Sequence, residues 1–429
     1  MTPRATILFL SQCLPYPPHT GVTNRTFNVL KQLARDFDIV LLPYFRSNHQ
    51  PTPEARRAAC RRLEQFVARV CTPVAIPAER SRLRRVWDHV RGLCAGRAYT
   101  YFEYESALFR DQLRLALAQE KPDLVHIDNL VDLHRWVPAL PPLPQACTHH
   151  NVESELLRTR AARTRWPILA RYVRRQARLV EQLERDCCPR FGLNVVMSSL
   201  DGDRLKTLAP SARIVVAPNG VDLDYFRPQN AEVVPGRVVF LGPMYMFPNR
   251  EGMAYFLEEI WPMVRMTQPS ASLRIIGPCS ESHRVRYERE PGVECLGYVQ
   301  DIRPHLAQAS CCVVPLRIGG GTRLKMLDSW AMGKAVVSTS LGCEGLKTVD
   351  GDNLLIRDDP EDFAAAVVAV LTEQGLRAKL QAGARRTVEE SYGWEQVGHT
   401  LRHAYRELLG RSGEPSRPDS EGPRVAVRV

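Results

Sequence analysis

The residues best suited to chemistry form a glycine-rich segment that follows an apolar run late in the chain. The segment reads Gly319, Gly320, Gly321, Thr322, Arg323, Leu324 and Lys325. Glycine backbone can approach a ligand closely, and the helix predicted next offers unpaired N–H groups at its positive dipole end. Arg323 and Lys325 add two cations at the same place. The segment therefore predicts a binding site for a diphosphate.

Asp328 lies one turn along that predicted helix. Side chains on a helix lean toward its N-terminus, so we expect the Asp328 carboxylate to lie near the diphosphate. A carboxylate accepts hydrogen bonds, and the hydroxyls of an attached ribose or hexose would donate them. The alternative is that Asp328 only pairs with Lys325 at i,i−3 spacing, which contributes roughly a few tenths of a kcal/mol.

Two adjacent histidines, His149 and His150, end a predicted strand at 145–150. A neutral imidazole can hydrogen-bond a sugar hydroxyl, although a histidine in the core or on the surface is the plainer interpretation of either residue. Glu153 would orient His150 or cap the helix that follows. His126, in the neighbouring strand at 123–128, is interpreted as a hydrogen-bonded core side chain.

Short apolar strands alternate with helical stretches along the chain, which indicates a doubly wound α/β protein. Ligands of such sheets bind beyond the carboxyl ends of the strands, which is where the residues above fall. We expect strands at 5–11, 38–44, 123–128, 145–150, 193–199, 237–242, 272–277, 293–299, 311–316 and 335–339.

The length of 429 residues predicts at least two domains, each with its own core. We predict a first domain at 1–220, with a basic, helix-rich insertion at about 53–119, and a second domain at 221–410. A last helix is expected around 394–409. The segment 411–429 is rich in Pro, Gly, Ser and charge and is expected to be a disordered tail.

The net charge is +11, and arginines are dense at 56–97 and at 158–178. Such regions meet anionic lipid, a phosphorylated substrate or nucleic acid, or are simply a solvated surface. We find no nucleic-acid-binding motif. No run reaches the roughly 20 apolar residues of a membrane span. The 12 cysteines show no metal-ligand spacing, so we expect reduced thiols in a cytoplasmic protein.

The segment from Leu327 to Thr339 reads LDSWAMGKAVVST and resembles glycosyltransferase family 4. The family's usual pattern is Pro-Ser-x-x-Glu-Gly-Phe-Gly, then Leu-Glu-Ala-Met-Ala-x-Gly-x-Pro-Val-Val-x-Thr. The second glutamate of its Glu-x7-Glu pair is Asp328 here, and the first falls on Gly320. The Gly-Gly-Gly-Thr-Arg-Leu-Lys version resembles a subgroup linked to bacterial exopolysaccharide assembly. The resemblance implies the GT-B fold, with two facing Rossmann-like domains and a C-terminal helix that crosses back.

The resemblance also implies which residues form the site. Gly21 would let the loop after the first strand approach the donor phosphate or the acceptor, and Asn24 and Arg25 would contact the acceptor. The catalytic residues implied are His150, with His149 as its rival, and Arg323, Lys325 and Asp328. The donor-binding residues implied are Gly21, Gly242, Tyr298, Val299, Gly319, Gly320, Gly321, Thr322, Arg323, Lys325 and Asp328.

The function implied is transfer of a sugar from a nucleoside diphosphate sugar to an acceptor hydroxyl, with retention, in polysaccharide or glycolipid assembly. We expect no cofactor and no metal, because no Asp-x-Asp pair stands out in the predicted cleft loops. The expected partners are the donor and a sugar or lipid-linked acceptor, with peripheral contact to the anionic inner membrane face as a further option; nucleic acid is not expected. A nucleotide-sugar epimerase and a non-catalytic nucleotide-sugar-binding protein are the alternatives.

Overall fold

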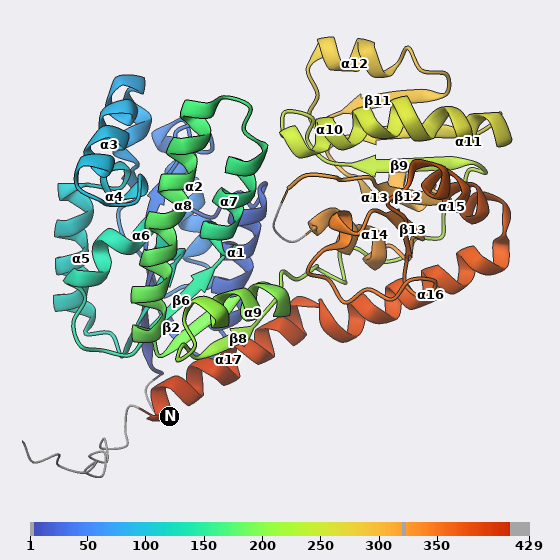
Figure 1. Cartoon of the computed structure of the whole chain (residues 1–429). Helices are drawn as coiled ribbons and strands as arrows, with labels where there is room; N and C mark the ends of the chain where they lie inside the picture. Colours follow the sequence, from blue (N-terminus) through green and yellow to red (C-terminus); the bar gives the residue numbers. More distant parts are fainter. Residues whose placement is uncertain (1–3, 320–322, 412–429) are drawn as a thin grey trace, which may run out of the picture.

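The computed structural model describes residues 4–319 and 323–411 and contains two parallel β-sheets flanked by helices (Figure 1). The first sheet has the order β3-β2-β1-β5-β6-β7-β8, with β4 paired to β2. Its strands are β1 (Thr6–Ser11), β2 (Asp38–Phe45), β3 (Arg69–Val70), β4 (Val74–Ala75), β5 (Leu124–Asp128), β6 (Gln145–His149), β7 (Leu193–Val196) and β8 (Ile214–Val216).

Alternate residues of β1 face two different apolar cores. Ile7 and Phe9 share a core with α1 (Gly21–Leu33), whereas Leu8 and Leu10 share a core with α5 (Ala107–Glu120). Successive side chains of a strand point to opposite faces, and both faces of this sheet are covered. The strand is therefore a continuous apolar run, which is why the sequence predicted it.

The insertion predicted at about 53–119 contains α2 (Pro53–Leu63), α3 (Arg82–Cys94), α4 (Thr100–Glu103) and most of α5. It also contains β3 and β4, which were not predicted and which extend the first sheet by pairing with β2. Each has 2 residues, too few to show an apolar alternation. The remaining helices of this half are α6 (Leu130–Leu133), α7 (Glu153–Arg163), α8 (Pro167–Cys187) and α9 (Ser199–Leu208).

The second sheet has the order β11-β10-β9-β12-β13-β14. Its strands are β9 (Arg237–Leu241), β10 (Ser272–Ile276), β11 (Val293–Gly297), β12 (Cys311–Val314), β13 (Val336–Ser338) and β14 (Leu355–Ile356). Its helices are α10 (Phe247–Tyr255), α11 (Trp261–Thr267), α12 (Glu281–Tyr287), α13 (Arg303–Ala307), α14 (Leu324–Ala331), α15 (Pro360–Thr372) and α16 (Gln374–Ser391). Two further apolar cores lie on its two faces.

The helix α17 (Trp394–Arg411) leaves the second half and runs back along the first (Figure 1). Trp394, Leu401 and Tyr405 belong to the apolar core that contains Ile7 of β1. The predicted α/β fold, with two facing Rossmann-like domains and a helix that crosses back, is thereby confirmed. The boundaries 1–220 and 221–410 stay predictions, and 412–429 of the predicted tail lie outside the described residues. Within the part that the structure describes, no helix is long and apolar enough to span a membrane.

Candidate functional site

Glycines line the carboxyl edge of the second sheet. Gly242 follows β9 and Gly277 follows β10, with φ angles of +146° and +143°. A Cβ on Gly277 would lie 2.3 Å from the carbonyl oxygen of Gly242, so these backbones approach more closely than any side chain permits. The N–H of Gly277 donates in turn to the carbonyl of Gly297, which ends β11, at 2.8 Å. The edge is a backbone surface on which a ligand can lie.

Tyr298 and Val299 follow this edge at the end of β11. Tyr298 is 71% exposed, whereas Val299 packs against the core that contains Met326 and Leu327 of α14. The Tyr298 ring is therefore free to contact a ligand, whereas Val299 anchors the end of β11 in the core.

Lys325 lies against the same edge, in the first turn of α14. Its Nζ donates to Oδ1 of Asn249 at 2.7 Å and lies 4.3 Å from the centre of the Phe240 ring. A Cβ on Gly242 would come within 2.7 Å of this Nζ. Burial, and next the nearby charge of Arg323, lower the pKa of Lys325 to about 7. Asn249 was missed as a site residue, because only its place after a strand-ending glycine marks it in the sequence.

Arg323 precedes α14, and its guanidinium is turned toward backbone carbonyls. Its Nη2 donates to the oxygens of Gly319 and Leu341, both at 3.1 Å, and the residue is 7% exposed. Burial lowers the pKa of this guanidinium. Arg323 thus joins the backbone at Gly319 to the backbone at Leu341. Its predicted contact with a diphosphate stays a prediction, and the three residues Gly320, Gly321 and Thr322 lie outside the described part of the chain.

Asp328 is half-buried on α14, one turn beyond Lys325. The alternative of an ion pair between them does not hold, because the Lys325 ammonium bonds to Asn249 and no ion pair between the two is present. Within residues 4–319 and 323–411, no group donates a hydrogen bond to the Asp328 carboxylate. Burial raises its pKa to about 7. A carboxyl group in this state is suited to bind hydroxyl groups.

On the first sheet, the structure pairs His150 with a carboxylate that was not predicted as a site residue. His150 Nε2 lies 3.1 Å from Oδ1 of Asp128, the last residue of β5. Oδ2 of Asp128 accepts from the Thr26 hydroxyl at 2.7 Å and from the Ser11 hydroxyl at 3.2 Å. Burial alone would raise the pKa of Asp128, but the His150 ring and the Thr26 hydroxyl bring it below its usual value. The carboxylate is therefore ionised and fixes the His150 ring.

The other two histidines belong to the core. His149 Nε2 lies 3.0 Å from Oδ1 of Asn194, and burial lowers the pKa of His149 to about 4. His126 Nδ1 lies 2.6 Å from the Tyr405 hydroxyl of α17, and burial lowers the pKa of His126 to about 3. The interpretation of His126 as a core side chain agrees with these contacts. Of the two rivals, His149 is therefore a core side chain, and His150 stays the predicted site histidine.

Glu153 is the first residue of α7, and burial raises the pKa of its carboxyl group. Its Oε1 accepts from Nδ2 of Asn151 at 3.2 Å. Glu153 therefore fixes the segment after His150 through Asn151, and the residue before it, Val152, is the N-cap of α7.

The two halves of the chain touch at the starts of α1 and α14. Gly21 is the first residue of α1, and a Cβ on it would lie 3.9 Å from Cδ1 of Leu324, the first residue of α14. The expectation that Arg25 contacts an acceptor is wrong. Arg25 is 1% exposed, and its Nη2 donates to the carbonyl of Ala217 at 2.7 Å because the segment that leaves β8 packs over it. Asn24, half-buried beside it, accepts from Nδ2 of Asn28 at 2.8 Å.

A cavity of about 110 Å³ lies between the two halves of the chain. Residues of α7 and α9 line one side, and Gly319, Leu341 and Gly345 line the other. An ion pair between Arg204 and Glu344, with Nη2 and Oε1 3.2 Å apart, joins the two sides. The cavity therefore reaches Gly319, whose carbonyl accepts from Arg323.

Two family models match this chain. The model described as glycosyltransferase family 4 matches residues 19–225, and the model described as glycosyl transferases group 1 matches residues 235–373. Together they cover most of the chain.

Curated relatives match part of the chain. An uncharacterised 44.6 kDa protein in the cps region of Klebsiella pneumoniae is 26% identical over 37% of this chain and 43% of its own length. The phosphatidyl-myo-inositol mannosyltransferase of Mycolicibacterium smegmatis is 29% identical over 49% of this chain and 58% of its own length. The chain thus spans about half the length of the curated relatives it matches.

Solved structures match almost the whole chain. Sucrose-phosphate synthase from Thermosynechococcus elongatus superposes with a TM-score of 0.69 at 15% identity, over 95% of this chain and 100% of that one. The Anabaena protein HepE in complex with UDP-glucose superposes with a TM-score of 0.62 at 13% identity, over 94% of this chain and 100% of that one. At such identities the likeness concerns the fold.

Proposed function

The chain belongs to glycosyltransferase family 4, and from this premise we propose that it transfers a sugar from a nucleoside diphosphate sugar to an acceptor hydroxyl, with retention at the anomeric carbon. Its two facing Rossmann-like domains have the GT-B fold.

One observation supports the proposal: polar side chains lie at the strand ends of both sheets, and the helices that follow them, α1 and α14, touch. The first-sheet site has a histidine, His150, fixed by the carboxylate of Asp128. The second-sheet site has a glycine edge with the cation Lys325 and the carboxyl group of Asp328. Gly21 at the start of α1 lies next to Leu324 at the start of α14, the helix that carries Lys325 and Asp328. A nucleoside diphosphate fits the glycine and lysine edge, and its sugar would then lie between Asp328 and His150.

Each residue has a role in the proposed reaction. As the bond between the anomeric carbon and the diphosphate breaks, negative charge grows on the leaving oxygen. Lys325 and the glycine backbone stabilise that charge. Asp328 and His150 hold the hydroxyls of the sugar, which orients the anomeric carbon toward the acceptor. The acceptor hydroxyl forms the new bond and gives its proton to the leaving phosphate, so the scheme uses neither an enzyme nucleophile nor a metal.

The donor class is supported by a structural neighbour, because HepE is described in complex with UDP and UDP-glucose. We therefore propose a UDP-sugar as the first donor to test. One relative is a protein of a cps region and the other is a phosphatidyl-myo-inositol mannosyltransferase. Their names support a sugar or lipid-linked acceptor in polysaccharide or glycolipid assembly. A protein that acts on such an acceptor would work at the cytoplasmic face of a membrane, in peripheral contact with it.

The first test is a donor screen by thermal shift, followed by a transfer assay. A donor present at about 100 times its dissociation constant stabilises the folded protein by about 2.7 kcal/mol. We expect one nucleoside diphosphate sugar to raise Tm and then to release its nucleoside diphosphate when sugar and lipid-linked acceptors are added. Asp328→Asn should weaken turnover more than it weakens binding of the free nucleoside diphosphate, because Asp328 is assigned to the sugar.

Other outcomes would contradict the proposal. A changed donor sugar without transfer would identify an epimerase. Tight binding of a nucleotide sugar without turnover, across a panel of acceptors that a known family member uses, would identify a binding protein. Transfer with inversion, read by NMR at the anomeric proton, would contradict the retaining mechanism alone.

A further inference from the structure

Helix α3 exposes an apolar face to solvent. Leu83 is 82% exposed and Trp87 is 62% exposed, and Val86 and Val90 between and beyond them are exposed as well. Soluble proteins rarely leave several large apolar side chains exposed on one helix without a partner.

A second apolar group lies at the connection between α7 and α8. Trp166 is 76% exposed and Ile168 is 88% exposed, and Leu169 beside them is also exposed. Figure 1 shows this connection and α3 at the same end of the first domain. We call the two groups together the apolar end face; it consists of Leu83, Val86, Trp87, Val90, Trp166, Ile168 and Leu169.

The two groups share one support. His89 of α3 bonds through Nδ1 to the hydroxyl of Tyr172 on α8. The backbone N–H of Tyr99, whose ring stacks on His89 with centroids 5.4 Å apart, donates to Oε1 of Gln176 on α8 at 3.0 Å. The helices α3 and α8 are therefore fixed to each other, so a single surface can engage both groups.

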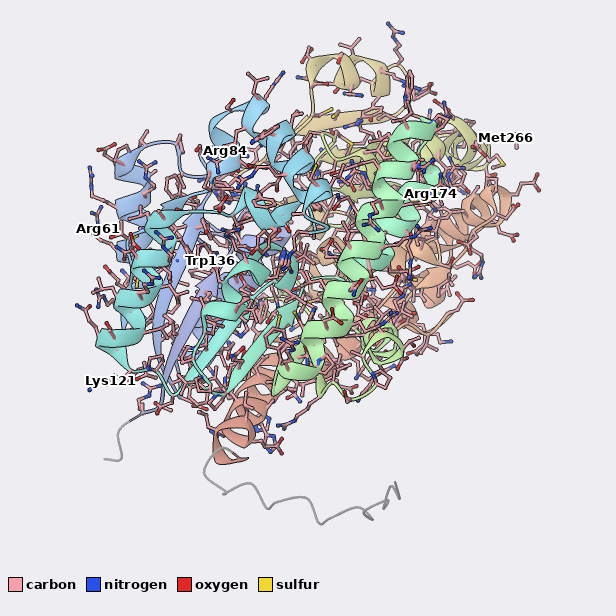
Figure 2. The ribbon with its side chains drawn as sticks, turned by 60° about the vertical axis from the view of Figure 1, so that its left-hand side comes forward. Arg61, Arg84, Lys121, Trp136, Arg174 and Met266 are labelled. Atoms are coloured by element: carbon pink, nitrogen blue, oxygen red, sulfur yellow. The ribbon has the colours of Figure 1, made fainter. Side chains whose placement is uncertain are left out.

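Arginines without acidic neighbours adjoin the apolar end face. The segment 158–178 contains 8 arginines and no aspartate or glutamate. Seven of these arginines are exposed and form no ion pair with any carboxylate in the described part of the chain: Arg160, Arg163, Arg165, Arg171, Arg174, Arg175 and Arg178. Figure 2 shows Arg174 on α8 and Arg84 on α3 on the same side of the molecule. Because these seven arginines have no carboxylate partner among the described residues, the surface should attract an anionic partner.

We propose that the apolar end face and the exposed arginines of α8 (Arg171, Arg174, Arg175 and Arg178) dock on a lipid bilayer with anionic headgroups. Tryptophan and branched aliphatic side chains enter the boundary between headgroups and acyl chains, and the arginines pair with lipid phosphates. Nucleic acid would satisfy the arginines but would leave Leu83 and Ile168 in water. The surface lies outside the proposed sugar-transfer site, so the inference does not depend on the donor or on catalysis.

The test is co-sedimentation of the whole protein with vesicles of phosphatidylcholine alone or with added phosphatidylglycerol. We expect binding only to the anionic vesicles. The apolar variant Trp87→Ser/Trp166→Ser/Ile168→Ser and the charge variant Arg171→Glu/Arg174→Glu/Arg175→Glu should each lower the bound fraction about tenfold. Only the wild type and the apolar variant should release further in high salt.

Matched controls change equally exposed residues of the second domain. Met266→Ser/Val349→Ser and Arg289→Glu/Lys379→Glu should bind vesicles as the wild type does. Thermal unfolding checks that each variant is folded, and donor-induced thermal shift should be unchanged in all of them. The inference is overturned if wild type and apolar variant sediment equally, if neutral vesicles bind as well, or if only a duplex nucleic acid binds. If the wild-type protein binds anionic vesicles but transfers no sugar, the result counts against the proposed function alone.

Discussion

A buried carboxylate, Asp128, determines which atom the His150 ring can offer to a ligand. Because the ionised Asp128 accepts the proton of Nε2, a neutral ring presents Nδ1 as an acceptor. Asp128→Asn keeps the volume but removes the charge that selects this arrangement. We expect kcat to fall roughly 10- to 100-fold, since a hydrogen bond to a charged group contributes about 1.5–3 kcal/mol. KM for the donor should change little.

Steady-state kinetics of Asp128→Asn and His150→Ala check this prediction, once thermal unfolding has shown that both variants are folded. Both variants should lose a similar part of the rate, and the double variant should lose little more, because Asp128 acts through His150. Independent, multiplying losses would mean that Asp128 has a separate role.

Lys325 and Asp328 should make the unfolding free energy of the ligand-free protein depend on pH in opposite directions. The pKa of Asp328 is raised to about 7, so between about pH 4 and 7 the folded state holds a proton that the unfolded state has lost. Stability should therefore fall as pH rises through this window. The pKa of Lys325 is lowered to about 7, so above pH 7 the unfolded state holds the extra proton. Stability should then rise again toward pH 10.

Chemical denaturation across pH measures this minimum near pH 7. Asp328→Asn should flatten the fall below pH 7, and Lys325→Met should flatten the rise above it. A profile that each variant leaves unchanged would show that these groups titrate as in water. Calorimetry adds an independent reading, because a diphosphate bound to Lys325 should raise its pKa and draw a proton from the buffer at pH 8.

At the scale of single elements, the end of β9 combines backbone strain with contact to the site. Gly242→Ala places a Cβ at φ +146° and 2.7 Å from both Lys325 Nζ and Asn249 Nδ2. Gly351→Ala is the matched control, because Gly351 has φ +75° and a Cβ added there would meet no atom within 4 Å. We expect both variants to lose about 1 kcal/mol of stability from the backbone conformation. Donor affinity, measured by calorimetry, should fall only for Gly242→Ala.

The elements show why the sequence predicted the long buried strands but not particular side-chain contacts. An apolar run such as Thr6–Ser11 reveals a strand buried on both faces, whatever it pairs with. The direction of a side chain depends on distant partners. Arg25 follows a strand-end loop as a ligand-binding residue would, but Ala217, far along the chain, supplies the carbonyl that holds it. Asp128 was passed over for the same reason, because its importance comes from His150 and Thr26.

At the scale of the whole molecule, the proposed function requires the two halves of the chain to stay joined and facing each other. The return helix α17 contributes to this, since its Tyr405 hydroxyl reaches His126 in the centre of the first sheet. The sequence predicted the helix, and the resemblance to the family predicted that it packs back across the first domain. It did not predict the ion pair of Arg204 with Glu344, because neither residue lies in a pattern that pairs α9 with the segment after β13.

That ion pair supports a prediction about closure of the two halves. Its side chains are 37% and 31% exposed, so its contribution should resemble that of a surface pair, about 0.2–1 kcal/mol. Arg204→Ala and Glu344→Ala should each raise KM for the donor up to about fivefold while leaving kcat nearly unchanged, because closure precedes chemistry. The double variant should show no further loss.

Arg204 also lies 3.8 Å from Asp201 within α9, so Asp201→Asn is the control that alters this helix without touching the ion pair between the halves. Additive losses in the double variant, or an equal effect of Asp201→Asn, would place the origin of the change within α9 and not between the two halves.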